Sequence, residues 1–364
     1  MKLDANRFPS RTYNFLKINE FPMDVQIKGW ANYTVNNTES TPLLVKNIPH
    51  DAESIETSLG KEFDILLDED NKNSNSCGDT LVIPENFVCP DFVNIKFVNA
   101  RTVVTKSDIV VHAKENSKST VVLSFENADF KEGGIVSRLR LLCESGSNLT
   151  VVLLNLAGSN CEIYSSVGAL VKENASLKII DVQLGGKILL SGSHVILEGR
   201  KSIFEGRTCY GARDNQNADI NYVVKHLGKE SESRMNVTGF VKDNAKKTWR
   251  GTIDFVNGCR NAFADENEDV LLLNPEVVNK SLPVILCDEE AVEGTHGASI
   301  GRLNLDMLFY LQSRGLTKEQ SENMMAKGKI YAAVNNVFGL AEMEKAESLE
   351  ESVNKYIEGI FDEN

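Results

Sequence analysis

The chain of 364 residues lacks the patterns that mark several common classes of protein. Lysine and arginine number 39 against 52 acidic residues, and this net charge of −13 argues against a nucleic-acid partner, because phosphates require a basic face. Unbroken apolar runs last only a few residues, so we expect no segment that spans a membrane. No GxxxxGK[ST] phosphate-binding loop occurs, so we expect this chain to bind no nucleotide.

Patterns for prebuilt metal sites and for secretion are also missing. The seven cysteines form no CxxC or CxxH pair, which argues against a zinc ribbon or a ferredoxin-type cluster. Histidine occurs only five times. The first residues show no apolar signal-peptide core, and the cysteine count is odd. These features indicate reduced thiols, and we expect a cytoplasmic protein.

What the chain does contain is a long stretch of alternating strand and turn patterns. From about Thr80 to Leu286, short Val/Ile/Leu runs are separated by Asn, Gly, Ser and Lys. Glu115, Glu144 and Glu173 recur at a period of about 29 residues, each before an apolar strand, and residues 241–256 give an off-period echo.

This repeat predicts a β-solenoid, because stacked coils bury their inner faces only against each other. The three glutamates are then expected in equivalent turns along one edge of the solenoid. An ordinary β-sandwich is the alternative, but its turns recur without matching one another. The polar run at residues 67–79 marks either a domain boundary or a surface loop within one domain.

After Ile300 the pattern becomes helical. Asn304 is a candidate N-cap and Gly315 a candidate C-terminal stop for a first helix at residues 304–315. Thr317 and Gln320 form a capping-box pattern for a second helix, from Lys318 to about residue 337. Apolar residues at helical spacing predict a third helix over about 340–361.

Several stretches of the chain match one known family. The segment "CDEEAVEGTHGASIGRLNLDMLFYLQSRGL" (287–316) strongly resembles the C-terminal signature of the SufB/SufD family of iron–sulfur cluster assembly proteins. Supporting matches are "GRKSIFEG" (199–206), "KKTWRGTIDFVNG" (246–258), "DVLLLNPEV" (269–277) and the opening "RTYNFLKIN" (11–19). The resemblance covers most of the chain and is weakest over residues 25–100.

The resemblance implies a mainly β fold, a right-handed parallel β-helix flanked by N-terminal and C-terminal α-helical segments. We therefore expect an N-terminal helical or irregular region at 1–78, a β-helix core at 79–301 and a C-terminal helical partner-docking region at 302–364. The family function implied is that of a scaffold rather than an enzyme. A SufB-like and a SufD-like subunit pair, each binds a SufC-like ABC-type ATPase, and a transient iron–sulfur cluster forms at their interface.

Two positions distinguish the subunit types within this resemblance. The SufB type carries a cysteine at the position near Glu268, where this chain has no thiol, whereas the SufD type carries the histidine that is His296 here. We therefore interpret the chain as SufD-like. Relatives often have cysteine two residues before that histidine, and here Gly294 stands instead.

Two further interpretations stay open. A SufB-like scaffold could form a homodimer, with Cys259 or Cys287 replacing the missing thiol. A carbohydrate-active β-helix enzyme is the more distant alternative, which the low aromatic content of 7% and the missing secretion signal disfavour.

His296 is the main candidate ligand for iron. The residues alone favour an imidazole that holds a turn before the first C-terminal helix. Neutral imidazole is nevertheless a suitable ligand for iron, and Gly297 and Ala298 leave room for a partner. With the resemblance added, we interpret His296 as a ligand of the cluster or metal.

The cysteines are weaker candidates. Cys287 follows an apolar strand and is expected as a buried thiol, with a role as second ligand as the alternative. Cys259 lies beside Arg260, which could lower the thiol pKa and make this sulfur reactive, but a structural role is favoured for it. Cys77 has no supporting context. The nearby acidic residues Glu289, Glu290 and Glu293 are interpreted as a solvated turn.

The first C-terminal helix is the candidate docking element. Its large apolar residues are expected mainly as helix core, with part of the face serving as a docking surface for the ATPase. The candidate docking residues are Leu308, Phe309, Tyr310, Leu311 and Arg314.

Overall fold

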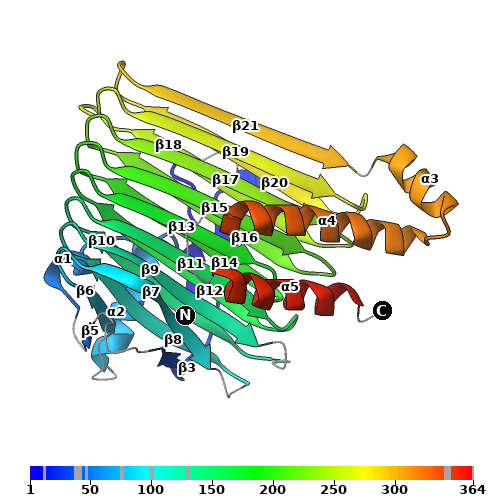
Figure 1. Cartoon of the computed structure of the whole chain (residues 1–364), viewed down its shortest axis with the longest axis horizontal. Helices are drawn as coiled ribbons and strands as arrows, with labels where there is room; N and C mark the ends of the chain where they lie inside the picture. Colours follow the sequence, from blue (N-terminus) through cyan, green and yellow to red (C-terminus); the bar gives the residue numbers. More distant parts are fainter. Residues whose placement is uncertain are drawn as a thin grey trace.

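The chain folds into a parallel β-solenoid with helices against its flanks, as the computed structural model shows (Figure 1). The structure describes residues 1–10, 14–36, 43–45, 48–73, 78–98, 102–127, 132–302, 304–339 and 346–362. Each coil adds one strand to each of two sheets, so neighbours within a sheet are every second strand of the chain. The mainly β, parallel β-helix fold predicted from the sequence is confirmed.

The two sheets are named here by their strand numbers. The even sheet contains, in chain order, β6 (Asp79–Ile83), β8 (Val104–Ala113), β10 (Gly134–Cys143), β12 (Glu162–Val171), β14 (Ile188–Leu197), β16 (Asn217–His226), β18 (Lys246–Phe255) and β20 (Val278–Cys287). The odd sheet contains β7 (Val88–Val98), β9 (Lys118–Asn127), β11 (Asn148–Ala157), β13 (Ser176–Gln183), β15 (Ile203–Ala212), β17 (Glu232–Val241), β19 (Phe263–Leu272) and β21 (Glu293–Arg302).

The core lies between the two sheets and is lined by alternate residues of each strand. On β10, Leu139 and Leu141 face this interior, whereas Val136 and Leu142 pack against elements outside the solenoid. Both faces of such strands are therefore buried. This explains why the strands are nearly continuous apolar runs rather than alternating ones.

The turns that carry the sequence repeat stack along one edge of the solenoid. The Asn116 N–H donates to the Ser145 carbonyl at 3.1 Å, and the Gly146 N–H donates to the Glu173 carbonyl at 2.9 Å. The expected stacking of Glu115, Glu144 and Glu173 in successive turns is confirmed, with one difference. The ladders align Cys143 with Ala113 and with Val171, so Glu144 lies one residue before the positions of Glu115 and Glu173 in the stack. This offset arises because successive coils differ in length.

The later echo at 241–256 belongs to the opposite edge, because its turn leads from β17 of the odd sheet to β18 of the even sheet. Sequence similarity among turns therefore identified the solenoid without assigning each turn to its edge.

Helices cover the outer faces of both sheets. The C-terminal helices α4 (Lys318–Gly339) and α5 (Ala346–Asp362) pack on the odd sheet, where Ile330, Val334 and Val353 share an apolar cluster with strand residues such as Ile180. They are preceded by α3 (Leu305–Ser313), and the expected caps of α3 and α4 are present. The third predicted helix is present as α5 over residues 346–362, and its expected start near residue 340 lies outside the described residues.

The N-terminal region contains more strand than the sequence suggested. The short strands β3 (Ile27–Trp30), β4 (Asn32–Val35) and β5 (Leu43–Val45) pair with β8, β7 and β6 respectively. A separate ribbon joins β1 (Lys2–Ala5) to β2 (Phe21–Asp24), and η1 (Asn14–Leu16) is a 3₁₀ turn. The first coil offers unpaired strand edges, and these segments satisfy them.

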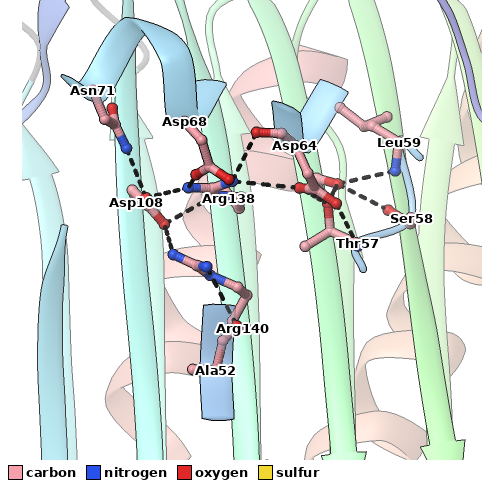
Figure 2. Close-up of polar contacts among 11 residues, drawn as sticks. Ala52, Thr57, Ser58, Leu59, Asp64, Asp68, Asn71, Asp108, Arg138 and Arg140 are labelled. Atoms are coloured by element: carbon pink, nitrogen blue, oxygen red, sulfur yellow. Dashed lines mark hydrogen bonds and ion pairs between the residues drawn. The ribbon is translucent and has the colours of Figure 1, made fainter. Parts of the chain in front are cut away.

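The helical part of this region, α1 (His50–Glu53) and α2 (Lys61–Asn73), is held to the even sheet by buried charges (Figure 2). The Asp108 carboxylate accepts from Arg138 at 3.1 and 2.5 Å, from Arg140 at 2.9 Å and from Asn71 at 3.0 Å. Arg138 also donates to Asp68 of α2 at 2.5 Å. Burial alone would raise the pKa of Asp108, but the two arginines hold it below its ordinary value.

Candidate functional site at the open end of the solenoid

The last coil, formed by β20 and β21, is here called the open end. In Figure 1, β21 is the outermost strand, and β19 is its one neighbour among the described strands. Residues along β21 are largely exposed, and Ile300 is 50% exposed. The outer edge of β21 therefore presents unpaired backbone groups, which favour pairing with another strand.

His296 lies within β21, so the expected turn at this position is wrong. The parallel ladder to β19 pairs His296 with Glu266 and continues through Gly294 and Ala298, which keeps the segment extended. A Cβ atom at Gly294 would press on the ring of Phe255, so this side of β21 faces the solenoid interior. By strand alternation, His296 faces the same way, at the mouth of the last coil.

Glu266 lies directly beneath His296 in the odd sheet. Its side chain is buried, and Oε1 accepts a hydrogen bond from Trp249 Nε1 at 2.9 Å. Burial raises the pKa of Glu266 to about 7, against the opposing effect of the Trp249 hydrogen bond. A Cβ atom at Gly251 would overlap the carboxylate, so the glycine clears space for it.

A second buried acid, Glu268, occupies the position at which the SufB type carries cysteine. Its carboxylate forms a buried ion pair with Lys247 of β18. Lys247 also lies 3.3 Å from the hydroxyl of Ser281, and burial lowers the pKa of the lysine. In the present chain this position therefore holds a carboxylate in contact with Lys247 rather than a thiol.

The structure corrects the expectations for two cysteines. Cys287 ends β20 and is exposed rather than buried, and its thiol donates to the Glu289 carbonyl at 3.1 Å. Cys259 is buried, and burial together with the charge of Glu289 raises its thiol pKa to about 11. Arg260 therefore does not activate this thiol, and its burial agrees with the structural role that the sequence favoured for Cys259. Cys77 lies outside the described residues.

The acidic turn between β20 and β21 is locally bonded, as expected for a solvated turn. The Glu289 carboxylate accepts from the backbone N–H groups of Gly258 at 3.0 Å and Ala291 at 3.2 Å. Within the described ranges, no group of three or more His, Cys, Asp or Glu residues is placed to hold a metal ion.

The candidate docking helix α3 extends beyond the ends of the strands (Figure 1). None of its residues is buried, so the expectation that its apolar residues mainly form a core is wrong. Phe309 is 74% exposed, Tyr310 is exposed, and Leu308 and Leu311 are half-buried. The Arg314 guanidinium lies over the Tyr310 ring, 5.2 Å from its centroid.

Sequence reasoning missed the buried polar residues of the last coils: Glu266, Glu268, Lys247 and Trp249. The relevant pattern was present, because Glu266 and Glu268 alternate with more exposed residues along a strand. Two acids two residues apart in a strand point to the same side. Which side is the interior depends on the register with neighbouring coils, and a single sequence does not reveal that register.

Comparison with known proteins agrees with the fold and the sequence motifs. A family model described as "SUF system FeS cluster assembly, SufBD core domain" matches residues 97–329. In the described part of the chain, no helix is long and apolar enough to cross a membrane.

Individual relatives match shorter stretches. Over 141 residues the chain is 30% identical to the iron–sulfur cluster assembly protein SufD of Bacillus subtilis, covering 39% of this chain and 32% of that protein. Over 161 residues it is 27% identical to the assembly protein SufB of the same organism, covering 44% and 34%. A SufBD family protein of Mycobacterium leprae is 24% identical over 204 residues, covering 54% and 52%.

The matched stretches thus span between a third and about half of the length of these relatives. SufD and SufB of one organism are both among them, at similar identity. The family model, in contrast, covers more than half of the chain and most of the solenoid. The chain belongs to the SufBD family of the SUF system for iron–sulfur cluster assembly.

Proposed function

We propose that this protein is a SufD-like scaffold subunit, not an enzyme, in a cytoplasmic complex that assembles iron–sulfur clusters. A SufB-like paralogue pairs with it, a SufC-like ABC-type ATPase hydrolyses ATP, and a transient cluster forms at the subunit interface. The observation that carries the proposal is the open end, where an exposed strand edge presents an inward-facing histidine. The regions 1–78, 79–301 and 302–364 act as N-terminal closure, solenoid core and docking region.

Pairing through the open end follows from the physics of strand edges. An exposed strand binds an extended segment of another chain through backbone hydrogen bonds, and its side chains add specificity. β21 has the length and exposure for this mode of association. A partner that pairs here would bring its own ligands close to His296.

The SufD-like role is supported by the chemistry at Glu268. A SufB-type subunit needs a thiolate at this position, and here a carboxylate is neutralised by Lys247. His296 would supply imidazole and the partner a thiolate, a mixed ligand set suited to a cluster that must later be released. Cys287, exposed at the same coil, is a weaker candidate for a second ligand, and buried Cys259 is not retained as one.

The exposed thiol of Cys287 also favours a second candidate function, a homodimeric scaffold of the SufB type. In that arrangement two copies of this chain would pair through their open ends, and Cys287 would supply the sulfur ligand. Purification of the chain with and without its paralogue distinguishes the two candidates, because the homodimer would hold iron and sulfide by itself.

The decisive experiment is anaerobic purification of the chain with its SufB-like and SufC-like partners, followed by assay of iron and acid-labile sulfide. We expect His296→Ala to leave the complex intact and to remove most of the cluster, and Cys287→Ser to have a smaller effect. Ser299→Ala, which changes the outward face of the same strand, is the matched control. Normal cluster content in the intact His296→Ala complex would contradict the ligand role.

A further inference from the structure

We propose that Glu266 is a second iron ligand supplied by this chain, so that Glu266 and His296 form an inward-facing half-site for Fe²⁺ at the open end. This inference rests on the proposed function, in which His296 meets the iron of the nascent cluster. It adds a ligand from the solenoid interior, one strand below the exposed edge.

The strand register brings the two side chains together. Glu266 of β19 and His296 of β21 are Cα partners in a parallel ladder. Neighbouring strands lie about 4.8 Å apart, and laterally paired residues point to the same side of a sheet. Ala264 and Val270, which alternate in phase with Glu266, belong to the core between the sheets, so the shared side is the interior.

Only one of the two carboxylate oxygens of Glu266 accepts a hydrogen bond in the described part of the chain. Oε1 accepts the Trp249 hydrogen bond, whereas buried Oε2 has no hydrogen-bond partner in the described part of the chain. The residue is only 1% exposed, so water does not readily compensate this oxygen. An unpaired buried polar atom costs about 1–3 kcal/mol and requires an explanation.

Nearby cations do not provide that explanation. Lys247 is the cation beside this strand, and its ammonium pairs with Glu268 rather than Glu266. Across the described ranges, no lysine or arginine forms an ion pair with Glu266. The space at Gly251 nevertheless accommodates the carboxylate, since any larger residue there would collide with it. The Glu266 side chain thus fits the space beside Gly251, but no lysine or arginine of the described ranges neutralises its carboxylate.

A divalent cation held between Glu266 and His296 would supply the missing charge. Carboxylate oxygen and imidazole nitrogen are both suitable ligands for Fe²⁺. Two protein ligands leave the other coordination positions to sulfide and to groups of the partner subunit. Binding in this way replaces a proton or solvent at the two ligands and involves no change of oxidation state.

The test is Fe²⁺ binding to the full-length chain alone, without an affinity tag, by equilibrium dialysis under argon with metal analysis. We expect Glu266→Gln and His296→Ala each to raise the apparent Kd for Fe²⁺ at least about tenfold, since even supporting residues at metal sites contribute that much. The double variant should bind no more weakly than the weaker single variant, because both remove one shared site. Circular dichroism checks the fold of each variant.

Glu293→Gln is the matched control, since it removes the same charge from β21 at a position on the outward face. We expect a change in Kd of less than about twofold, well below the tenfold scale of a lost metal contact. If Glu266→Gln fails to fold, Glu266→Asp, which retracts the carboxylate and keeps its charge, should weaken binding in the same way.

Unchanged Fe²⁺ affinity in folded Glu266→Gln would overturn the inference, and so would equal losses in Glu266→Gln and Glu293→Gln. The proposed function is judged separately, by cluster content of the His296→Ala complex. Loss of Fe²⁺ binding in His296→Ala but not in Glu266→Gln therefore overturns the half-site and leaves the proposed function standing.

Discussion

The first and last coils of the solenoid have the same two-strand structure, but their outer strand edges differ: those of the first coil are paired and that of β21 is not, among the described strands. At the N-terminal end, β4 and β5 pair with the first strands, and α2 is tied to the even sheet through the buried Asp108 network. At the open end, β21 is exposed along its length, and α3 has no buried residue. Among the described residues, no strand pairs with the outer edge of β21.

This difference suggests that the closed end stabilises the fold and that the open end serves association with a partner. Repeat proteins need capped ends, because an unfinished coil exposes apolar surface and strand edges. Here the closed end has its first strands paired by β4 and β5, and the buried Asp108 carboxylate is paired with Arg138 and Arg140 of the same chain. The open end keeps its unpaired edge beside His296, which is the arrangement expected of a surface that is completed by a partner.

The largest effect is expected from Asp108→Ala at the closed end. The carboxylate is fully buried and neutralises Arg138 and Arg140, so its loss leaves two buried guanidinium groups undercompensated. We expect the free energy of unfolding to fall by about 3–5 kcal/mol, measured by urea unfolding at pH 7.

The control for this variant lies at the open end. Thr295→Ala breaks an exposed hydrogen bond to Asp265 and should change stability by less than about 0.5 kcal/mol. If Asp108→Ala and Thr295→Ala lowered the free energy of unfolding equally, the closed end would not be the more stabilising of the two ends.

The closed end was also the harder one to predict from sequence. Turns with the same polar residues before apolar strands indicate stacked coils, and the caps at Asn304 and Thr317 identify helix starts, because both signals are local. The short strands β3 to β5 form because the first coil offers edges to pair with, which is a tertiary cause. Likewise, the pairing of Arg138 with Asp68 joins segments far apart in the chain.

At the open end, the sequence motif around His296 was recognised, but its conformation as a strand was not predicted. Glycines around His296 suggested a turn, but the ladder to β19 holds the segment as a strand. Exposure of Cys287 and burial of Cys259 depend on which coil is last, and no local pattern encodes that. The candidate ligand His296 could be named from sequence, whereas its neighbour Glu266 required the register.

An intermediate effect is expected from Phe309→Ala on α3. Its ring is exposed, so the variant should change stability by less than about 0.5 kcal/mol. If α3 docks the ATPase, loss of this aromatic anchor should weaken binding by about 2 kcal/mol, or roughly 30-fold, in calorimetric titration with the SufC-like subunit.

A point variant is preferable to deletion of residues 304–364, which would uncover the apolar face beneath α4 and α5. Ile203→Ala, which removes another partly exposed apolar side chain from the solenoid, is the control. Unchanged binding by Phe309→Ala would move the docking surface away from α3.

The smallest effect concerns single thiols. At pH 8, Cys287 should react with iodoacetamide in the folded protein, because it is exposed. Cys259 should react only after unfolding, because it is buried and a thiol with pKa about 11 is only about one thousandth ionised at pH 8. Mass spectrometry of the labelled peptides distinguishes the two. Faster labelling of Cys259 would show that the last coils open more readily than the structure implies.

The most direct test of an open docking end is hydrogen–deuterium exchange in the free chain and in the complex with the SufB-like subunit. In the free chain, peptides from β21 should exchange fast and those from β8 and β10 slowly, because only the latter lie between paired strands. On complex formation, β21 should become strongly protected while β8 and β10 change little. If β21 exchanges equally fast in the intact complex, partner pairing occurs elsewhere and the account is wrong.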